Sequence, residues 1–278
     1  MPKRRPDSHK GNFGRLLVVG GGSRYVGAPA LVGLAALHSG VDLAIIAAPE
    51  KTAWAINSLS PDLITVKLHC QDLEPTALSE VFEELESSTA VVVGPGLGPL
   101  PKTLEAVINL ARMLRKTHPE LPVLFDADSF KALATERDLL KDLPWVMTPH
   151  TGEFKILTGY DLPADLKGRA EMAKKAAGEL GCVILLKGHV DIIASPDGGL
   201  KLNHTGNPGM TVGGTGDVLS GIVGAFLSQG VPPFKAAAAG AWVCGRAGDL
   251  CLREKGYEFV ASDVIDKIPE VFKEVRSK

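Results

Sequence analysis

Residues 203–217 hold the densest group of residues whose types could do chemistry, because three glycines lie just before Asp217. Glycine has no Cβ atom, so several backbone N–H groups can converge on one ligand atom. The apolar pattern after Asp217 predicts a helix, whose N-terminus carries about half a positive charge. This combination favours an anion hole for a phosphate or an oxyanion. The expected anion-hole residues are Gly213, Gly214, Thr215 and Gly216.

Asp217 places a carboxylate beside this expected anion site. A carboxylate there would repel a bare phosphate, so its presence fits better with a general base. We interpret Asp217 as the group that takes a proton from a hydroxyl whose oxygen attacks or leaves a phosphorus atom. The alternative is an ordinary N-cap aspartate after a glycine turn. A cap alone does not explain the clustered glycines, so we favour the catalytic interpretation.

Two familiar phosphate motifs do not fit the chain. After Gly22, Ala28 and Pro29 occupy the positions where a P-loop needs Lys and Ser or Thr. A dinucleotide-binding fingerprint that starts at Gly96 needs its third glycine at position 101, which is a proline. We interpret residues 94–98 as a glycine-rich floor at the carboxyl end of a strand, where ligands of open α/β sheets bind.

Polar residues directly follow two further predicted strands. Asp126 and Asp128 could hold Mg²⁺ through water, which a phosphoryl reaction needs to offset charge. The alternative is that these carboxylates cap the helix expected from Ser129. His150 follows a proline and precedes Gly152, so we expect it in a shaped loop where it contacts a ligand.

Residues 187–191 lie between a strongly apolar predicted strand and a predicted hairpin. Lys187 could meet a phosphate, and Gly188 could let a nucleotide lie against the backbone. The alternative is an exposed lysine at the end of a strand. We favour a nucleotide contact for this segment.

Short apolar runs alternate with segments long enough for helices along most of the chain. This alternation predicts a mostly parallel sheet with helices on both faces. The turn-forming residues 195–199 join two short runs and predict a β-hairpin at one sheet edge. The predicted strands are residues 16–19, 42–46, 63–66, 90–93, 122–125, 145–148, 182–187, 191–194 and 200–202, and predicted helices include 28–38, 217–228, 233–253 and 263–275.

The composition is typical of a globular protein with a large core. The chain has 278 residues, of which 45% are hydrophobic. A chain of this size typically buries about 75% of its unfolded surface. Because no linker, low-complexity segment or fixed-period repeat divides it, we predict a single α/β domain over residues 1–278.

Charge and terminal sequence narrow the partners and the location. The 30 Lys and Arg residues against 32 Asp and Glu residues give a net charge of −2, which argues against nucleic acid or an anionic membrane as a partner. The basic residues 1–6 run into polar residues rather than an apolar signal segment, and no stretch is apolar enough to cross a bilayer. We therefore expect a cytoplasmic protein. Its four cysteines form no Cys-x-x-Cys pair and are expected to be reduced core residues.

Together these segments resemble the ribokinase-like superfamily and, within it, the ADP- or ATP-dependent NAD(P)H-hydrate dehydratases. The Gly-Thr-Gly-Asp string at residues 214–217 alone indicates only a ribokinase-like kinase. The Asn-Pro-Gly-Met string at residues 207–210 and the block at residues 20–28 narrow the resemblance to the dehydratases. The other matching segments are residues 10–14, 94–98, 126–128, 148–153 and 187–188. The resemblance implies a three-layer α/β/α fold with a mostly parallel sheet and an edge hairpin.

The resemblance also implies a function. Members of this family are hydro-lyases that dehydrate the S epimer of hydrated NADH or NADPH back to the intact cofactor. The C6 hydroxyl of the hydrate is phosphorylated and phosphate then leaves, so ADP is consumed to AMP and phosphate. We therefore expect ADP or ATP as cosubstrate and Mg²⁺ as cofactor.

The matching positions receive roles by the same resemblance. Asp217 would be the base that acts on the hydroxyl, and the anion hole would hold the transferred phosphoryl group. The expected contacts to the hydrated dinucleotide are Ala28, Gly98, His150 and Asp217. The expected contacts to ADP or AMP are Lys187, Gly188, His189, Val190, Asp191 and Gly216.

The family further implies partners. Its members assemble as homotetramers, and many bacterial members are fused to an N-terminal epimerase domain. We expect this chain to lack that domain and to work with a separate NAD(P)H-hydrate epimerase.

Two other functions remain open. A vitamin-precursor kinase could use the same Asp217 and anion hole, but it would leave a stable phosphorylated product instead of phosphate and NADH. A non-catalytic nucleotide sensor could keep the same pocket. Such a sensor would have no need of a carboxylate that weakens phosphate binding.

Overall fold

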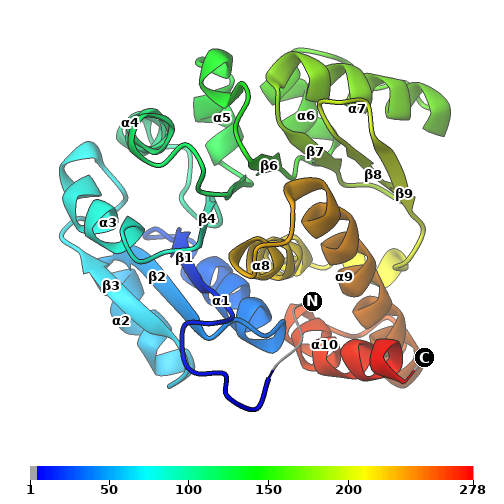
Figure 1. The fold of residues 1–278 in the computed structure, drawn as a ribbon, viewed down its shortest axis with the longest axis horizontal. Coiled ribbons are helices and arrows are strands. Elements are labelled where there is room, and N and C mark those ends of the chain that lie inside the picture. Colours follow the sequence, from blue (N-terminus) through cyan, green and yellow to red (C-terminus); the bar gives the residue numbers. More distant parts are fainter. Residues whose placement is uncertain (1–4, 278) are drawn as a thin grey trace.

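The computed structural model describes residues 5–277, which contain a nine-stranded sheet (Figure 1). The strands lie in the order β3 (Ile64–Leu68), β2 (Leu43–Pro49), β1 (Arg15–Val19), β4 (Ala90–Val93), β5 (Val123–Phe125), β6 (Trp145–Met147), β7 (Val183–Leu186), β8 (Asp191–Ala194) and β9 (Leu200–Asn203). Neighbouring strands from β3 to β7 are parallel, and β8 and β9 add an antiparallel hairpin at the edge. The predicted sheet is thus confirmed. Most of the basic N-terminal start, residues 1–4, lies outside the described residues.

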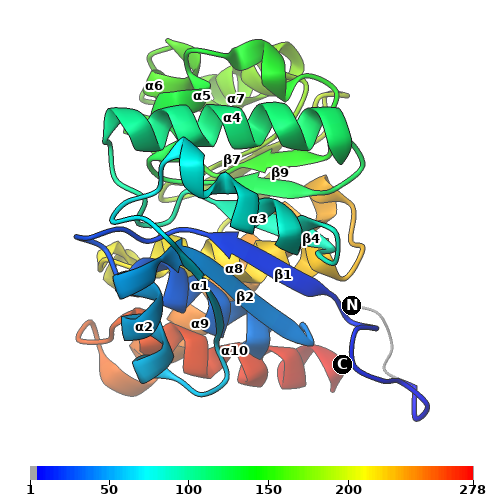
Figure 2. The ribbon, with the colours of Figure 1, turned by 90° about the vertical axis from the view of Figure 1, so that its left-hand side faces the viewer.

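Helices cover both faces of the sheet, as Figure 2 shows from the side. One layer contains α1 (Gly27–His38), α2 (Glu50–Leu59), α8 (Thr215–Ser228), α9 (Pro233–Lys255) and α10 (Ala261–Arg276), and the other contains α3 (Leu78–Leu85), α4 (Pro101–Thr117), α5 (Ser129–Leu133), α6 (Thr151–Thr158) and α7 (Leu166–Leu180). In β1, Leu16 and Val18 face the first layer, whereas Leu17 and Val19 face the second. Successive strand side chains point to opposite faces, so an unbroken apolar strand supplies both cores.

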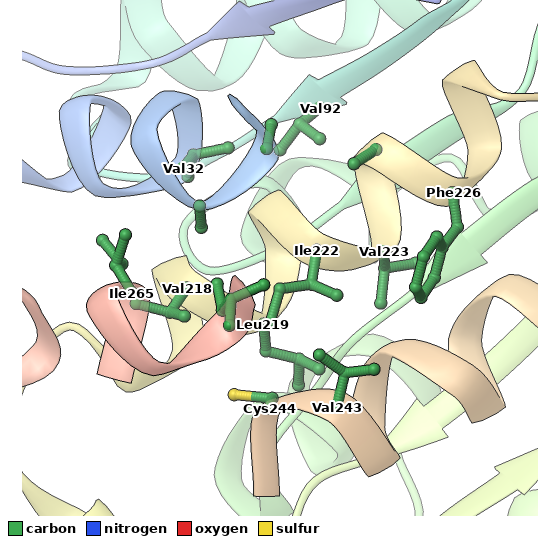
Figure 3. Packing of buried hydrophobic residues seen from close by; sticks show 14 of the residues in the cluster. Val32, Val92, Val218, Leu219, Ile222, Val223, Phe226, Val243, Cys244 and Ile265 are labelled. Atoms are coloured by element: carbon green, nitrogen blue, oxygen red, sulfur yellow. The ribbon is translucent and has the colours of Figure 1, made fainter. Parts of the chain in front are cut away.

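Helix α8 occupies the centre of the first layer. Every residue in the range 218–228 is buried. Figure 3 shows its apolar side chains among Val32 of α1, Val243 of α9 and Ile265 of α10. Each large apolar side chain removed from water contributes about 1.5–3 kcal/mol. The helix that carries Asp217 is therefore packed on several sides and fixed relative to the sheet.

The predicted elements are confirmed, and their ends differ from the predicted ends by three residues or fewer. The four cysteines are free, and three of them, Cys182, Cys244 and Cys251, are buried, as predicted for reduced core residues. Within residues 5–277, no helix combines the length and the apolar character needed to span a bilayer.

The glycine-rich loop after β4 packs directly on the end of β5. Gly94 has φ of 128°, a conformation that side chains rarely adopt. A Cβ atom at Gly94 would lie 1.8 Å from the carbonyl oxygen of Asp126. The loop floor can therefore approach Asp126 only because residue 94 has no side chain.

We predict that Gly94→Ala lowers the free energy of unfolding by at least about 2 kcal/mol, because it adds a backbone clash to an unfavourable φ. Urea unfolding would measure the loss. Gly198→Ala is the matched control, since Gly198 has φ of 87° but open space around its Cβ position. Equal losses in the two variants would contradict the close approach at Asp126.

Candidate active site

The predicted anion-hole residues lie at the N-terminus of α8. Gly214, with φ of 95°, is the N-cap, and Thr215 is the first helical residue. Asp217 is therefore the third residue of the helix, and its interpretation as an N-cap is wrong. The hydroxyl of Thr215 donates to the carbonyl oxygen of Met210 at 2.8 Å, so its hydrogen is already used within the chain. No atom lies within 4 Å of a Cβ position at Gly213, which leaves open space beside this turn.

The environment of Asp217 suits a general base. Burial and the nearby negative charge of Asp126 raise its pKa to about 7, although the ammonium of Lys187 acts in the opposite direction. A general base works best when its pKa lies near the working pH. At neutral pH the charged and neutral forms of Asp217 are therefore both populated, and the carboxylate form can accept a proton.

Lys187 lies directly beside this helix terminus. Its Nζ donates to Asp126 Oδ1 at 2.9 Å and lies 3.7 Å from Glu153 Oε2. Burial disfavours the ammonium, but Asp126, Glu153 and Asp217 outweigh that cost and raise the pKa of Lys187. A Cβ atom at Gly216 would lie 3.6 Å from Nζ, so the charge sits against the first turn of α8. The alternative of an exposed lysine at a strand end is wrong.

The two predicted carboxylates after β5 have different partners. Asp126 is only 2% exposed, and its Oδ2 accepts a hydrogen bond from Ser220 of α8 at 2.8 Å. Asp128 accepts from the backbone N–H of Gly98 at 3.1 Å and pairs with Lys131 at 2.8 Å. Neither side chain caps α5, so the capping alternative is wrong.

The described residues contain no cluster of three or more His, Cys, Asp or Glu side chains that could hold a metal ion. Mg²⁺ usually takes only one or two carboxylates and completes its shell with water and substrate phosphates. Asp126 and Asp128 lie at the end of β5, and Lys187 already occupies one oxygen of Asp126. Ser220 holds the other oxygen of Asp126, and Lys131 pairs with Asp128, so contact of these carboxylates with Mg²⁺ would run through water.

The predicted dinucleotide contacts Ala28, Gly98 and His150 lie in three different segments, of which the first two are close together. A Cβ atom at Gly96 would lie 3.2 Å from Cβ of Ala28, so the start of α1 lies against the loop that carries Gly98. The Cβ position of Gly98 faces open space. His150 is the N-cap of α6, and its Nδ1 accepts from the N–H groups of Gly152 and Glu153 at 2.9 and 3.3 Å. Its ring stays largely exposed, with 60% of the side chain accessible.

A cavity of about 410 Å³ opens beside Lys187. Five of the six predicted nucleotide contacts line it: Lys187, Gly188, His189, Asp191 and Gly216. Val190 does not line the cavity, and its carbonyl oxygen lies 3.3 Å from the Cβ position of Gly188. The remaining walls come from Thr205, Gly206, Asn207, Pro208, Met210, Thr211, Thr215, Leu219, Ala241, Cys244 and Gly245. Sequence reasoning missed the contribution of α9.

Asp191 shapes the rim of this cavity. Its Oδ1 accepts from the N–H of Gly188 at 3.1 Å, and its Oδ2 accepts from the side-chain amide of Asn203 at 3.0 Å. Burial raises the pKa of Asp191, while these two hydrogen bonds favour the carboxylate. Asp191 therefore fixes the backbone that is predicted to contact the nucleotide.

Sequence reasoning also missed Ser220 and Glu153 as members of the charged cluster. Ser220 lies three residues after Asp217, which places both side chains on one side of the helix. Glu153 lies three residues after His150, at the N3 position of a capping box. Both spacings are visible in the sequence. The sequence does not show that Ser220 bonds to Asp126 or that Glu153 lies beside Lys187.

The pKa of Asp217 predicts that Asp217→Asn is more stable than the parent protein at pH 8. The folded carboxyl has a pKa of about 7 against an ordinary value of 3.8, so ionising it costs folding free energy. The parent therefore loses stability as the pH rises from about 4 to about 7, and an uncharged Asn avoids this loss. Urea midpoints should favour the variant at pH 8 and converge near pH 4. Parallel pH profiles would contradict the raised pKa.

Comparison with known sequences identifies relatives. Residues 16–270 match the sequence model of the NAD(P)H-hydrate dehydratase family. A bifunctional NAD(P)H-hydrate repair enzyme from Pyrobaculum aerophilum is 46% identical over 97% of this chain and 52% of its own length. An ADP-dependent (S)-NAD(P)H-hydrate dehydratase from Cenarchaeum symbiosum is 39% identical over 98% of this chain and 93% of its own length. The chain spans about half the length of the bifunctional relatives that it matches.

Solved structures agree with this assignment. An ADP/ATP-dependent NAD(P)H-hydrate dehydratase from Bacillus subtilis, co-crystallised with ATP and Mg²⁺, superimposes with a TM-score of 0.79 and 29% identity, covering 99% of this chain and 94% of that one. A ribokinase-like superfamily protein from Enterococcus faecalis gives a TM-score of 0.83 and 26% identity, covering 98% and 91% of the two chains. The resemblance inferred from the motifs is confirmed: this chain belongs to the NAD(P)H-hydrate dehydratase family and has the ribokinase-like fold.

Proposed function

We propose that this chain is an ADP-dependent (S)-NAD(P)H-hydrate dehydratase that returns hydrated NADH or NADPH to the intact cofactor. The observation that carries this proposal is the placement of Asp217, whose pKa is about 7, beside the N-terminus of α8 and Lys187. A base, a helix N-terminus and a cation then lie together, and Lys187, Thr215 and Gly216 of this group line one cavity. Family membership and the dehydratase activity for which the Cenarchaeum symbiosum relative is named support the same reaction.

The chain's own residues suggest how the reaction proceeds. Asp217 accepts the proton of the C6 hydroxyl, whose oxygen attacks the terminal phosphorus of ADP while the bond to AMP breaks. The N–H groups of the first turn of α8 and the Lys187 ammonium stabilise the charge on the transferred group. Phosphate then leaves C6, the neighbouring ring carbon loses a proton, and the ring double bond is restored. With ATP in place of ADP, the nucleotide product would be ADP.

Different residues bind the two substrates that meet at the point of phosphoryl transfer. Residues 187–191 and Gly216 bind the adenine nucleotide. Val190 contributes indirectly, because its carbonyl oxygen packs against Gly188. Ala28, Gly98 and His150 contact the hydrated dinucleotide. Mg²⁺, held by the nucleotide phosphates and through water by Asp126 or Asp128, would supply further charge compensation.

We further propose a cytoplasmic homotetramer that works with an NAD(P)H-hydrate epimerase. The bifunctional names of the longer relatives support the pairing of the two activities. Much of the alanine-rich start of α9 packs within the chain. Ala236, Ala237 and Ala241 are buried in the core of the chain itself, and a Cβ atom at Gly240 would lie 2.4 Å from Val223 of α8.

The proposal predicts that the protein with Mg²⁺ and ADP restores the near-ultraviolet absorbance of NADH from prepared NADH hydrate and releases one phosphate per NADH. Asp217→Asn should lower kcat about 10²- to 10⁴-fold, the usual worth of a general base, and remain folded. Near-normal turnover of this variant would refute the assignment of Asp217. A stable phosphorylated product without NADH would instead favour the vitamin-precursor kinase.

The cavity predicts that Gly245→Ala weakens ADP binding about tenfold or more, because small displacements of a binding site have large effects. A Cβ atom there would lie 2.3 Å from Thr205 Oγ1 and 2.6 Å from its carbonyl oxygen, so the cavity wall must move. Calorimetry would measure the affinity. Gly178→Ala in α7 is the control, since its Cβ position has no neighbour closer than 4.0 Å. Unchanged affinity in Gly245→Ala would place the nucleotide elsewhere.

A further inference from the structure

A chain of buried hydrogen bonds connects α8 to Lys187. Ser220 Oγ donates to Asp126 Oδ2 at 2.8 Å, and Lys187 Nζ donates to Asp126 Oδ1 at 2.9 Å. Ser220 is completely buried and Asp126 is 2% exposed. We call Ser220, Asp126 and Lys187 the relay. It joins the middle of α8, the end of β5 and the residue that follows β7.

Only one end of the relay reaches the cavity. Lys187 lines it, whereas Asp126 and Ser220 do not. Substitution of Asp126 or Ser220 therefore removes no direct contact to a ligand bound there. Substitution of Ser220 changes the support of the Lys187 ammonium, because one oxygen of Asp126 is held by Ser220 and the other holds Lys187. Substitution of Asp126 also removes the negative charge that raises the pKa of Asp217, so Ser220→Ala is the variant that isolates the relay.

The relay also fixes α8 in rotation. A serine hydroxyl inside a helix commonly bonds to the carbonyl oxygen four residues earlier. Ser220 instead donates across to Asp126, 94 residues away in the sequence. Because Ser220 lies three residues after Asp217, this bond orients the side of the helix that carries the base. The Asp126 carboxylate thus helps to position both Lys187, which it bonds directly, and Asp217, through the orientation of α8.

Simple stabilisation explains the relay poorly. Buried ion pairs often contribute no net stability compared with apolar side chains of the same size, because both charges lose their hydration. Catalysis gives the arrangement a better reason, since displacing a reacting group by about 1 Å can cost about 10² in rate.

We propose that Ser220 and Asp126 are positioning residues that hold the Lys187 ammonium over the first turn of α8, at the point of phosphoryl transfer. The proposal rests on the proposed function for its catalytic consequence. The geometric part, that Ser220 acts on Lys187 through Asp126, does not depend on the reaction.

Three variants of the full chain test the relay. Ser220→Ala removes the first hydrogen bond, and Asp126→Asn removes the charge while keeping the shape. Ser228→Ala is the matched control, because Ser228 is also a buried serine of α8 and its hydroxyl has no hydrogen-bond partner within residues 5–277. Thermal unfolding would be recorded for each variant, so that turnover is compared between folded proteins.

Steady-state kinetics with ADP and NADH hydrate give the first readout. A hydrogen bond to a charged group has a worth that corresponds to about tenfold or more in rate, so Ser220→Ala should lower kcat about tenfold. Asp126→Asn should lower kcat about 100-fold, since it also removes the counter-charge. Both KM values should stay within about twofold of the parent, and the control should match the parent. A rise in KM without a fall in kcat would overturn the positioning role.

Chemical labelling gives a readout that does not require turnover. Limiting acetic anhydride, followed by peptide mass spectrometry, reports how accessible the Lys187 amine is in the nucleotide-free protein. Labelling of Lys187 should be several-fold faster in Ser220→Ala than in Ser228→Ala. Equal labelling in these two variants would overturn the relay. Absence of dehydratase turnover in the parent protein, with faster labelling in Ser220→Ala, would refute the proposed function and leave the geometric coupling supported.

Discussion

The ion pair between Lys187 and Asp126 is the contact on which the geometry of the site depends. It joins the residue after β7 to the end of β5, and the second oxygen of Asp126 brings in α8 through Ser220. Burying a carboxylate costs free energy unless it is paired and hydrogen-bonded. Buried Asp126 therefore favours conformations in which Lys187 and Ser220 stay within hydrogen-bond distance. Elements that are far apart in the sequence are thus fixed to one another at the edge of the sheet where their strands end.

The same ion pair helps to set the chemistry of Asp217. The Lys187 ammonium is shared among Asp126, Glu153 and Asp217, but its hydrogen bond goes to Asp126. Asp217 is left with burial and the repulsion of Asp126, which together raise its pKa to about 7. A carboxylate with an ordinary pKa would stay charged beside an incoming phosphate and would be a weak base. The raised pKa therefore reconciles a carboxylate with an anion hole.

The sequence predicts those features whose cause is local. Unbroken apolar runs predict the strands of a sheet covered on both faces, and the closely spaced glycines before Asp217 predict the turn that begins α8. Ser220 and Glu153 could not be assigned in this way. Their partners lie 94 and 34 residues away, and only the folded sheet brings them together. His150 is a different case, because the sequence contains a local signal that was not used. Its His-x-x-Glu spacing is compatible with the capping box that the structure shows at the start of α6.

The two halves of the proposed nucleotide site have different physical origins. The charged half comes from strand ends and a helix terminus, which parallel α/β topology always brings to one edge. The cavity beside it exists because α9 presents small residues, Ala241 and Gly245, to the loop that contains Thr205. A side chain at Gly245 would clash with Thr205 and force this wall of the cavity to move. The strand ends therefore determine which reaction the site can perform, and α9 determines which ligand has room to bind.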